Sequence, residues 1–403
     1  MKKLYIILSF ALILRLLLTF YFGNLHGENY WEYGEIAKNI IIGHGYSLFY
    51  FNDSELDYHF NENVKPAKSA YMPPGYVFFL LPFMLVRNVF LKNLLIILMQ
   101  IGISVFTIYL IFSLSKKIFS ERVALIAAFL AAITPDLIYA DYSFTPTVIF
   151  HFLIVLLFIV ITNKHRNTFA MVVIGSIIVL ICYFRMEFIL FAIFFIAYTI
   201  FKREYKFSFI ILSIIILLLS PWIIRNFLSF DKFVPFTTSF GINLYRGNNY
   251  ISIGDWGDEK IIDEIRNTKG KNPEIAMNSV YTIHAIDYIK SNPIKILENG
   301  PIKIFYFVLY NPNDIRSKNI FYQISAFLYL MFFIYGMIKT FSIKKFRYFY
   351  IFFIYFTFVI IIFFPMIRYQ TMMKIMMVPF CAAGLADFFY RLNNVVKFHH
   401  PAD

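Results

Sequence analysis

The 403-residue chain has few of the residues that build disulfide-linked or highly charged soluble domains. It contains only 2 cysteines, and charged residues make up 15% of the sequence. Cys182 and Cys381 both lie in apolar runs, so neither a disulfide framework nor a cysteine metal cluster is expected. Apolar and polar residues do not alternate with a period of two, which argues against a membrane β-barrel. Despite the net charge of +13, the chain has no separate basic soluble segment, which argues against nucleic-acid binding.

Hydrophobic residues are abundant instead, at 60% of the chain. Apolar runs of about twenty residues recur along most of the sequence, which is typical of a helical membrane protein with many spans. Residues 4–22 follow two lysines but have no small-residue cleavage site, so we expect a membrane helix rather than a signal peptide. Lysine and arginine in the short turns mark the cytoplasmic side, and they place both ends of the chain there.

The apolar runs predict about ten spans in an all-α membrane bundle. Their approximate ranges are 4–22, 94–114, 123–139, 146–162, 169–184, 187–201, 207–223, 319–338, 348–366 and 373–390. The apolar stretch from Pro74 to Val86 would be only about 20 Å long as a helix, which is too short for a bilayer core of about 30 Å. We therefore expect it to be a re-entrant or interfacial helix in the first outer loop.

Three parts are expected on this basis. They are a transmembrane core at 1–220 that includes the first outer loop (24–93), an extracytoplasmic loop or small subdomain at 221–318, and C-terminal transmembrane helices with a cytoplasmic tail at 319–403. Helical spacing of apolar residues predicts helices near 259–266 and 273–291 within the second part, and a disordered linker is the alternative.

Acidic residues are scarce on the predicted outer side. Those in the first outer loop are Glu28, Glu32 and Glu35, and those in the next are Asp136 and Asp141. The three glutamates would share one face of a helix, because they are four and three residues apart. Burial by their aromatic neighbours would raise the pKa of such a carboxyl towards neutrality, as a general base requires. An ordinary solvated acid, or for Asp136 a capping role beside Pro135, is the alternative.

Arginines recur at the predicted outer ends of the helices. They are Arg185, Arg225, Arg246 and Arg368. A single one would extend to lipid headgroups, but several around one face suggest a phosphate site, because the guanidinium group matches phosphate oxygens. Arg15 lies inside the first span, so it needs a partner or a wet cavity, and it is a weaker candidate for the same site.

Several motifs together resemble one family. In the first outer loop they are Ile36-Ala37, Gly43-His44-Gly45-Tyr46-Ser47 and Pro73-Pro74-Gly75-Tyr76. Further along they are Lys116-Lys117-Ile118-Phe119, Pro221-Trp222-Ile223-Ile224-Arg225-Asn226, Gly247-Asn248-Asn249 and Arg368-Tyr369. This set resembles the bacterial GT-C glycosyltransferases, a family that includes lipid A aminoarabinose transferases and protein O-mannosyltransferases. The resemblance runs from the first helix to residue 249 and includes the last outer turn, and the stretch at 221–226 is its most specific part.

The resemblance implies a multi-pass enzyme of the bacterial cytoplasmic membrane, with its active site on the extracytoplasmic side. It would transfer a sugar from a polyprenyl-phosphate carrier, with inversion, to a cell-surface glycan, lipid or protein. A carboxylate of the first outer loop would be the general base, which points to Glu28, with Glu32 in reserve. Donor phosphate binding is assigned to Arg225, Arg368, Arg185, Lys68 and Arg246, and the acceptor or pocket residues are Asp141, Tyr71, Tyr76 and Asn248. No metal ligand is assigned, and the resemblance leaves a requirement for a divalent cation open.

The chain departs from the family pattern at three places. Asn29 stands where relatives usually carry Asp, Met72 replaces an Arg, for which Lys68 would substitute, and no acid lies between Ser143 and Thr147. These departures are compatible with a loss of catalysis. The sequence is also compatible with a transporter or flippase of lipid-linked sugars, and with a non-catalytic envelope assembly protein. A flippase should carry polar residues deep in the membrane, whereas the polar residues here gather at the outer face.

Overall fold

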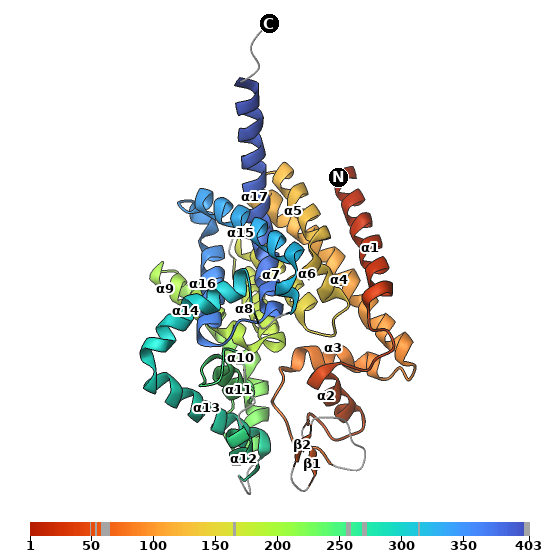
Figure 1. Ribbon diagram of the computed structural model, residues 1–403, viewed down its shortest axis with the longest axis vertical. Helices are drawn as coiled ribbons and strands as arrows, with labels where there is room; N and C mark the ends of the chain where they lie inside the picture. The colour runs from red at the N-terminus through yellow and green to blue at the C-terminus, as the bar shows by residue number, and fades with distance from the viewer. Residues whose placement is uncertain are drawn as a thin grey trace.

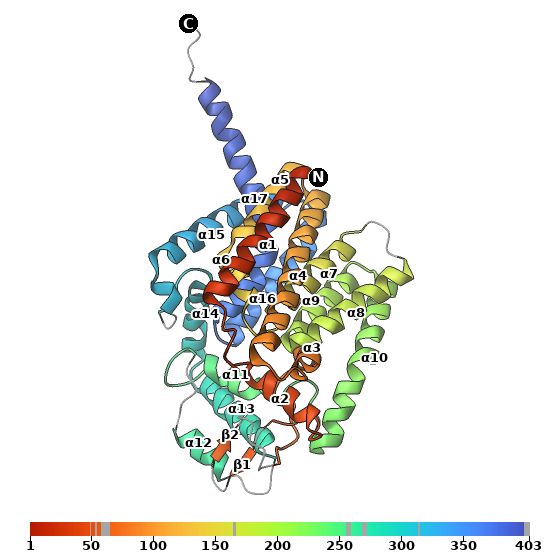
Figure 2. The ribbon, with the colours of Figure 1, turned by 90° about the vertical axis from the view of Figure 1, so that its right-hand side faces the viewer.

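The computed structural model describes residues 1–398, apart from 49, 53–54, 58–64, 164–166, 255–258, 268–271 and 313–314. It is a helical bundle with both termini at one end, and the strand pair and α12 lie at the opposite end (Figures 1 and 2). The basic turns predict that the end near the termini is cytoplasmic. We therefore call the opposite end the outer end.

Six helices are long and apolar enough to cross a membrane, and a seventh crossing is formed if α5 and α6 count as one span bent by 58°. The six are α1 (Lys2–Phe22), α4 (Val89–Ile118), α10 (Tyr205–Phe230), α15 (Ile320–Thr340), α16 (Arg347–Ile362) and α17 (Ile367–Phe398). The bent pair is α5 (Glu121–Ile133) and α6 (Pro135–Asp141). Shorter apolar helices are α3 (Pro74–Met84), α7 (Thr147–Ile161), α8 (Thr168–Phe184) and α9 (Ile189–Phe201), the last continuing from η1 (Met186–Phe188). Each predicted span thus corresponds to an apolar helix, although this criterion does not confirm the number of about ten crossings.

The remaining elements are short or amphipathic. They are α2 (Trp31–Ile41), β1 (Tyr50–Asn52), β2 (Glu55–Asp57), α11 (Phe240–Gly247), α12 (Glu259–Arg266), α13 (Pro273–Ser291), α14 (Pro293–Val308), η2 (Ile315–Lys318) and η3 (Lys344–Phe346). The strands form an antiparallel pair in which Phe51 lies opposite Leu56. The helices expected at 259–266 and 273–291 are confirmed, whereas α11 and α14 were not predicted. Helix α10 also extends seven residues beyond its predicted end at 223, with Pro221 in its interior.

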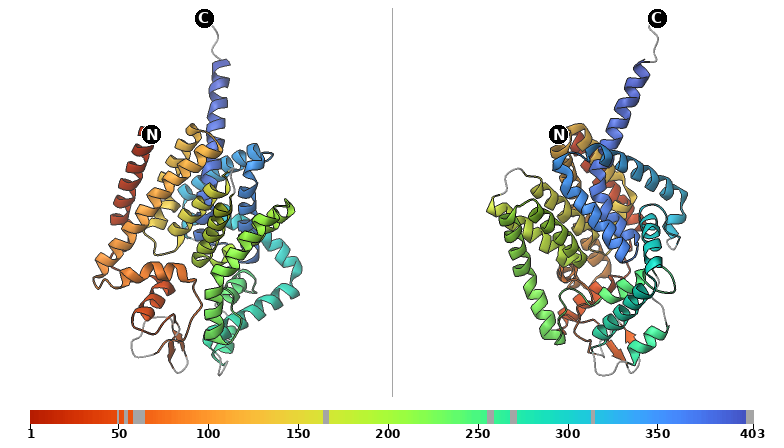
Figure 3. Two further views of the ribbon diagram at one scale, coloured as in Figure 1. Left: turned by 180° about the vertical axis from the view of Figure 1, so that it is seen from behind. Right: turned by 90° about the vertical axis from the view of Figure 1, so that its left-hand side faces the viewer.

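Helix α3 confirms the expected interfacial helix of the first outer loop. Its 11 residues span about 16 Å, which is half of a bilayer core. It runs across the outer side of the bundle rather than along it, as seen from the front in Figure 1 and from behind in Figure 3. Helix α2 packs against α3, so the polar loop that carries the candidate acids lies directly on the end of the bundle.

The basic turns gather at the end near the termini. The Lys117 amine donates to the carbonyl of Ile159, 2.9 Å away, and the Lys345 amine donates to the carbonyl of Ile118, 2.6 Å away. These contacts join three turns that the distribution of positive charge predicts to be cytoplasmic.

A labelling experiment tests this orientation. A cysteine that replaces Lys65, which is exposed at the outer end, should react with a membrane-impermeant maleimide in intact spheroplasts. A cysteine at Lys202, in the exposed turn after α9, should react only after the membrane is permeabilised. The native Cys182 and Cys381 are buried, so the unsubstituted protein gives the background level of labelling. The opposite labelling pattern would invert the topology.

Two ion pairs lie inside the bundle, and both use acids of the short helix α6. Arg15 of α1 contacts Asp141 at 2.7 Å, and both side chains are 1% exposed. Arg15 also donates to the Ser104 hydroxyl and to the carbonyls of α5, which supplies the partner that an arginine within a span needs. Lys374 of α17 pairs with Asp136. Helix α6 is therefore tied to the first and the last helix of the chain.

Candidate functional site

A cavity of about 1140 Å³ lies at the outer end of the bundle, where α2 and the α11–α13 region meet the membrane helices. Its lining comes from both outer loops and from the turns that follow α8 and α16. Most of the lining side chains are apolar or aromatic, and the charged and amide-bearing ones are Glu32, Arg185, Glu187, Asn243, Arg246 and Asn278. A large apolar cavity with a few convergent polar groups is the usual form of a ligand site.

Glu32 is the first-loop acid that lines this cavity. It lies in the first turn of α2, where the helix dipole favours a negative charge. Trp31 begins the helix with φ = 53° and also lines the cavity. A bulky residue in the left-handed region costs energy, and such strain recurs at functional sites. Tyr71 lines the cavity as well, and its pKa is raised first by burial and then by the charge of Glu32.

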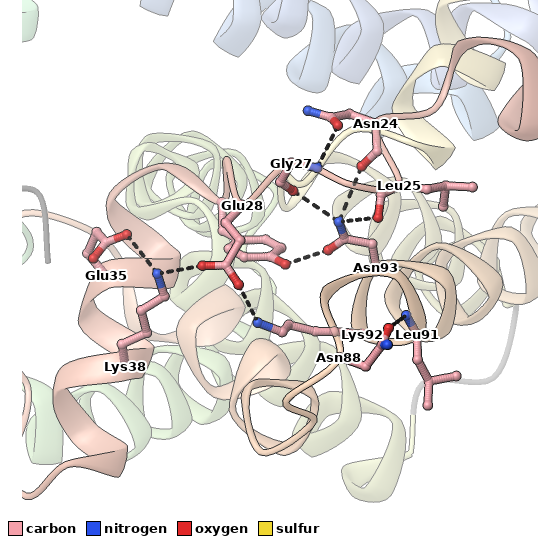
Figure 4. A network of polar contacts seen from close by, with 11 residues as sticks. Asn24, Leu25, Gly27, Glu28, Glu35, Lys38, Asn88, Leu91, Lys92 and Asn93 are labelled. Atoms are coloured by element: carbon pink, nitrogen blue, oxygen red, sulfur yellow. Dashed lines mark hydrogen bonds and ion pairs between the residues drawn. The ribbon is translucent and has the colours of Figure 1, made fainter.

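Glu28 takes a different position. Its carboxylate contacts the Lys92 amine at 2.9 Å and the Lys38 amine at 3.3 Å, and the side chain is 41% exposed (Figure 4). The hydrogen bond from Lys92 lowers the pKa of Glu28, so the expected rise in pKa is wrong for this residue. Because α2 begins at Trp31, Glu28 also does not share a helical face with Glu32. It joins α2 to the start of α4 and does not line the cavity.

The loop around Glu28 is held by the first turn of α4. The Asn93 amide donates to the carbonyls of Leu25 and Gly27, each 3.0 Å away, and its oxygen accepts from the Tyr30 hydroxyl (Figure 4). These contacts hold a largely exposed loop against the bundle, and they give the carbonyls of Leu25 and Gly27 hydrogen-bond partners. They therefore fix the position of the chain that leads into α2, and with it the residues of α2 that line the cavity.

Two of the five predicted donor residues line the cavity. Arg185 follows α8 and is 7% exposed. Its guanidinium lies 5.3 Å from the centre of the Tyr369 ring and 3.7 Å from the Glu187 carboxylate, and its buried Nε has no hydrogen-bond partner among the described residues. Arg246 lies over the Phe364 ring at 4.3 Å, and its Nε donates to the carbonyl of Gly254 at 3.0 Å. Both cations therefore face the same cavity as Glu32.

Two of the other three predicted donor residues, Arg225 and Lys68, do not line it. Arg225 donates to the backbone carbonyls of Ser69 and Tyr46 and stacks against the Tyr46 ring at 5.0 Å. Its contacts therefore hold the chain in place and do not reach the cavity. Lys68 is exposed, outside the cavity lining. Arg368 lies in the first turn of α17, and its side chain is outside the described part of the chain.

Of the predicted acceptor or pocket residues, only Tyr71 lines the cavity. Tyr76 is buried and donates to the Gln100 side chain at 2.9 Å. Asp141 pairs with Arg15 inside the bundle, so its expected position in an outer loop facing the cavity is wrong. Asn248 donates to the carbonyl of Ile362, the last residue of α16, at 2.8 Å.

The Gly-Asn-Asn turn at 247–249 has a structural explanation. A Cβ at Gly247 would collide with the Phe363 carbonyl oxygen, so only glycine allows this approach. Lys303, which is buried, donates to the neighbouring carbonyl of Ile361 at 2.8 Å. The turn and Lys303 together satisfy the C-terminal carbonyls of α16 and place Phe363, which lines the cavity.

Sequence reasoning missed Glu187, Tyr369 and Glu274. Glu187 lines the cavity two residues after Arg185, and its place at the end of a predicted span could have indicated it. Nothing in the sequence separates the buried Glu274 from an exposed acid in the first turn of a helix. Among the described residues, no three His, Cys, Asp or Glu side chains form a group that could hold a metal ion.

Comparisons with known proteins concern the fold. No protein-family model matches the sequence, and no curated protein matches it. The structure is similar to the oligosaccharyltransferase AglB from Archaeoglobus fulgidus in complex with an inhibitory peptide and a dolichol-phosphate, with 13% identity over 100% of this chain and 52% of that chain and a TM-score of 0.61. A second structure of this oligosaccharyltransferase, with Zn and sulfate, has 14% identity over 98% of this chain and 50% of that chain and a TM-score of 0.59.

The chain thus spans about half the length of these oligosaccharyltransferase structures. A weaker similarity is to ArnT from Cupriavidus metallidurans bound to undecaprenyl phosphate, with 9% identity over 94% of this chain and 77% of that chain and a TM-score of 0.41. The apolar helices make the chain a multi-pass membrane protein, and its fold is that of the oligosaccharyltransferase AglB, a GT-C fold.

Proposed function

We propose that the protein is a glycosyltransferase that takes a sugar from a polyprenyl-phosphate carrier and transfers it to a cell-surface glycan, lipid or protein. The reaction takes place on the outer face of a bacterial cytoplasmic membrane. The observation that carries this proposal is one cavity at the outer end of a GT-C bundle, lined by the carboxylate of Glu32 and by the guanidinium groups of Arg185 and Arg246. An acid that accepts a proton and cations that bind a phosphate are the two groups that this reaction needs.

The general base is Glu32, the reserve candidate of the sequence analysis. Its carboxylate accepts the proton of the acceptor hydroxyl while the hydroxyl oxygen attacks the anomeric carbon of the sugar. The bond from that carbon to the phosphate oxygen breaks, and its electron pair leaves with the polyprenyl phosphate. Attack from the side opposite to the leaving group inverts the anomeric configuration. Glu28 instead holds α2 in place through its two lysine partners.

Arg185 and Arg246 stabilise the negative charge that develops on the departing phosphate. Arg185 suits this role because it is buried at the cavity and no described residue accepts a hydrogen bond from its Nε, so a phosphate oxygen can be the acceptor. The first isoprene units of the carrier bind the apolar lining formed by Ile189 and Leu190 of α9, by Phe236 after α10 and by Phe240 at the start of α11.

Transfer is tested by reconstituting the purified protein with polyprenyl-phosphate sugars and a membrane extract as the source of acceptors. Release of polyprenyl phosphate that depends on both components is expected. Movement of the carrier across the bilayer without release would show a flippase instead. A flippase would need a polar path through the bundle. Within the described residues, the cavity beside the buried Arg15 is only about 10 Å³, which leaves room for no more than one water molecule.

Replacing Arg185 with alanine should lower kcat/KM for the donor by about 10²- to 10³-fold, because a preorganised donor to the leaving phosphate is lost. Arg185→Lys should recover only part of this loss, since an ammonium group lacks the two-pronged geometry of guanidinium. The matched control is Arg87→Ala, which removes an exposed arginine from the loop before α4 and should change the rate less than about 2-fold. Initial rates at varied donor concentration measure the effect. Equal rates for the Arg185→Ala and Arg87→Ala proteins would rule out the phosphate role.

A further inference from the structure

Three segments that are distant in sequence meet behind one wall of the cavity. They are residues 68–71 at the end of the first outer loop, residues 236–239 after α10, and the first turn of α13. Glu274 of α13 lies at their junction and is fully buried. One of its carboxylate oxygens accepts the backbone N–H of Ala70 at 2.7 Å and the hydroxyl of Thr238. Burial of a carboxylate costs free energy unless hydrogen-bond donors compensate it, and Ala70 and Thr238 supply two such donors.

The backbone of residues 68–70 is held by the other two segments and by α10. The Lys68 carbonyl accepts from the Asn272 amide at 3.3 Å, and the Ser69 carbonyl accepts from the guanidinium of Arg225. The Ala70 carbonyl accepts from the backbone N–H of Thr238 at 3.1 Å. Consecutive carbonyls thus bind three different partners, and Glu274 adds the bond to the Ala70 N–H. The junction therefore determines the path of the chain into residue 71.

Residues on both sides of this junction line the cavity. Tyr71, Met72 and Pro73 follow Ala70, and Thr237 and Ser239 flank Thr238. The phenol of Tyr71, which the junction places, therefore lines the same cavity as the proposed base Glu32. A shift of the Ala70 backbone would move this phenol relative to Glu32. Glu274 itself does not line the cavity.

We propose that Glu274 is a positioning residue: through Ala70 and Thr238 it holds the segment from Ser69 to Pro73 so that Tyr71 lines the same cavity as Glu32. The consequence for catalysis rests on the proposed function, whereas the junction itself does not. Misplacement of a group by about 1 Å near reacting atoms can cost about 10²-fold in rate. Loss of Glu274 should therefore affect turnover although this residue touches no substrate.

The junction also responds to pH. Arg225 from α10 faces Glu274, as do the phenols of Tyr46 and Tyr71 from the first outer loop. Burial, the largest effect, raises the pKa of Glu274 from 4.5 to about 7. The folded protein thus binds this proton more tightly than the unfolded chain does. The resulting stabilisation is fully present below pH 4.5 and is lost as the pH rises through about 7.

The test that does not depend on activity uses hydrogen exchange of the detergent-solubilised full chain. In Glu274→Ala, amides of residues 67–72 should exchange about 10- to 100-fold faster than in the wild type. The thermal midpoint of the wild type should decrease between pH 6 and pH 8. The midpoint of Glu274→Gln should not, because the glutamine side chain stays neutral at every pH. Glu298→Gln is the matched control, because this acid of α14 is 57% exposed, and it should behave as the wild type in both measurements. If Glu274→Ala does not fold, Thr238→Val removes one of the two donors with a milder effect expected in the same direction.

The second measurement uses sugar transfer. Glu274→Ala should lower kcat by about 10- to 100-fold with the KM for the donor nearly unchanged, and Glu274→Gln should retain most of the rate at pH 6. Unchanged exchange of residues 67–72 in Glu274→Ala would overturn the inference, as would a wild-type kcat. If exchange changes as expected but even the wild-type protein transfers no sugar, the proposed function fails and the junction stands.

Discussion

Replacing Glu32 with glutamine should reduce sugar transfer by about 10²- to 10⁴-fold, the usual contribution of a general base. The substitution keeps the size and hydrogen-bonding capacity of the side chain but removes its ability to accept a proton. Glu32 lies in the first turn of α2 and is not one of the buried residues of that helix, so the protein should remain folded. The measurement is the initial rate of polyprenyl-phosphate release, with thermal midpoints recorded for both proteins.

Glu28→Gln is the matched control for this experiment. Glu28 belongs to the same loop and forms partly exposed ion pairs with Lys38 and Lys92, and such pairs each contribute about 1 kcal/mol or less. Glutamine still accepts a hydrogen bond from Lys92, so the rate should fall less than about 10-fold. If the Glu28→Gln protein were inactive and the Glu32→Gln protein active, Glu28 would be the general base.

Replacing Asp141 with leucine should produce the largest loss of stability in the chain, about 3 to 5 kcal/mol, because Arg15 is then buried without its partner. Ser104→Ala, which removes only a neutral hydroxyl near Arg15, should cost about 1 kcal/mol. The measurement is the thermal midpoint of the purified protein in detergent, supported by the yield of folded protein in the membrane fraction.

The double substitution Arg15→Met with Asp141→Leu tests whether the two side chains act as a pair. Because an apolar pair of similar volume needs no ionic partner, the double variant should be clearly more stable than Asp141→Leu alone. If Asp141→Leu were as stable as the wild type, or if the double variant lost as much stability as the two single variants combined, the two side chains would not act as a pair.

The membrane helices were predictable because their signal is local. A run of about twenty apolar residues is read directly from the chain, and positive charge in the turns orients the whole bundle. The length of the stretch after Pro74 was enough to predict that α3 lies at the interface. Helices α11 and α14 were missed because they are short or mix apolar and charged residues, so neither shows an apolar run of sufficient length.

The candidate site was only partly predictable. Arginines at the outer ends of helices pointed to Arg185 and Arg246, which do line the cavity. The same argument selected Arg225, whose guanidinium instead binds backbone carbonyls of the first outer loop. The resemblance ranked Glu28 above Glu32, which lies four residues further on in the same acidic loop. What separates them is Lys92 at the start of α4, 64 residues beyond Glu28, and no local pattern indicates that contact.

By itself, the sequence determined that this protein is a bundle of membrane helices with a polar outer end, because hydrophobicity and charge act residue by residue along the chain. Only the tertiary structure decided which polar groups share the cavity. Glu32, Arg185 and Arg246 come from three separate parts of the chain, and packing of the helices brings them together. That packing depends on buried contacts between distant residues, such as Arg15 with Asp141 and Glu274 with Ala70, which no single stretch of sequence contains.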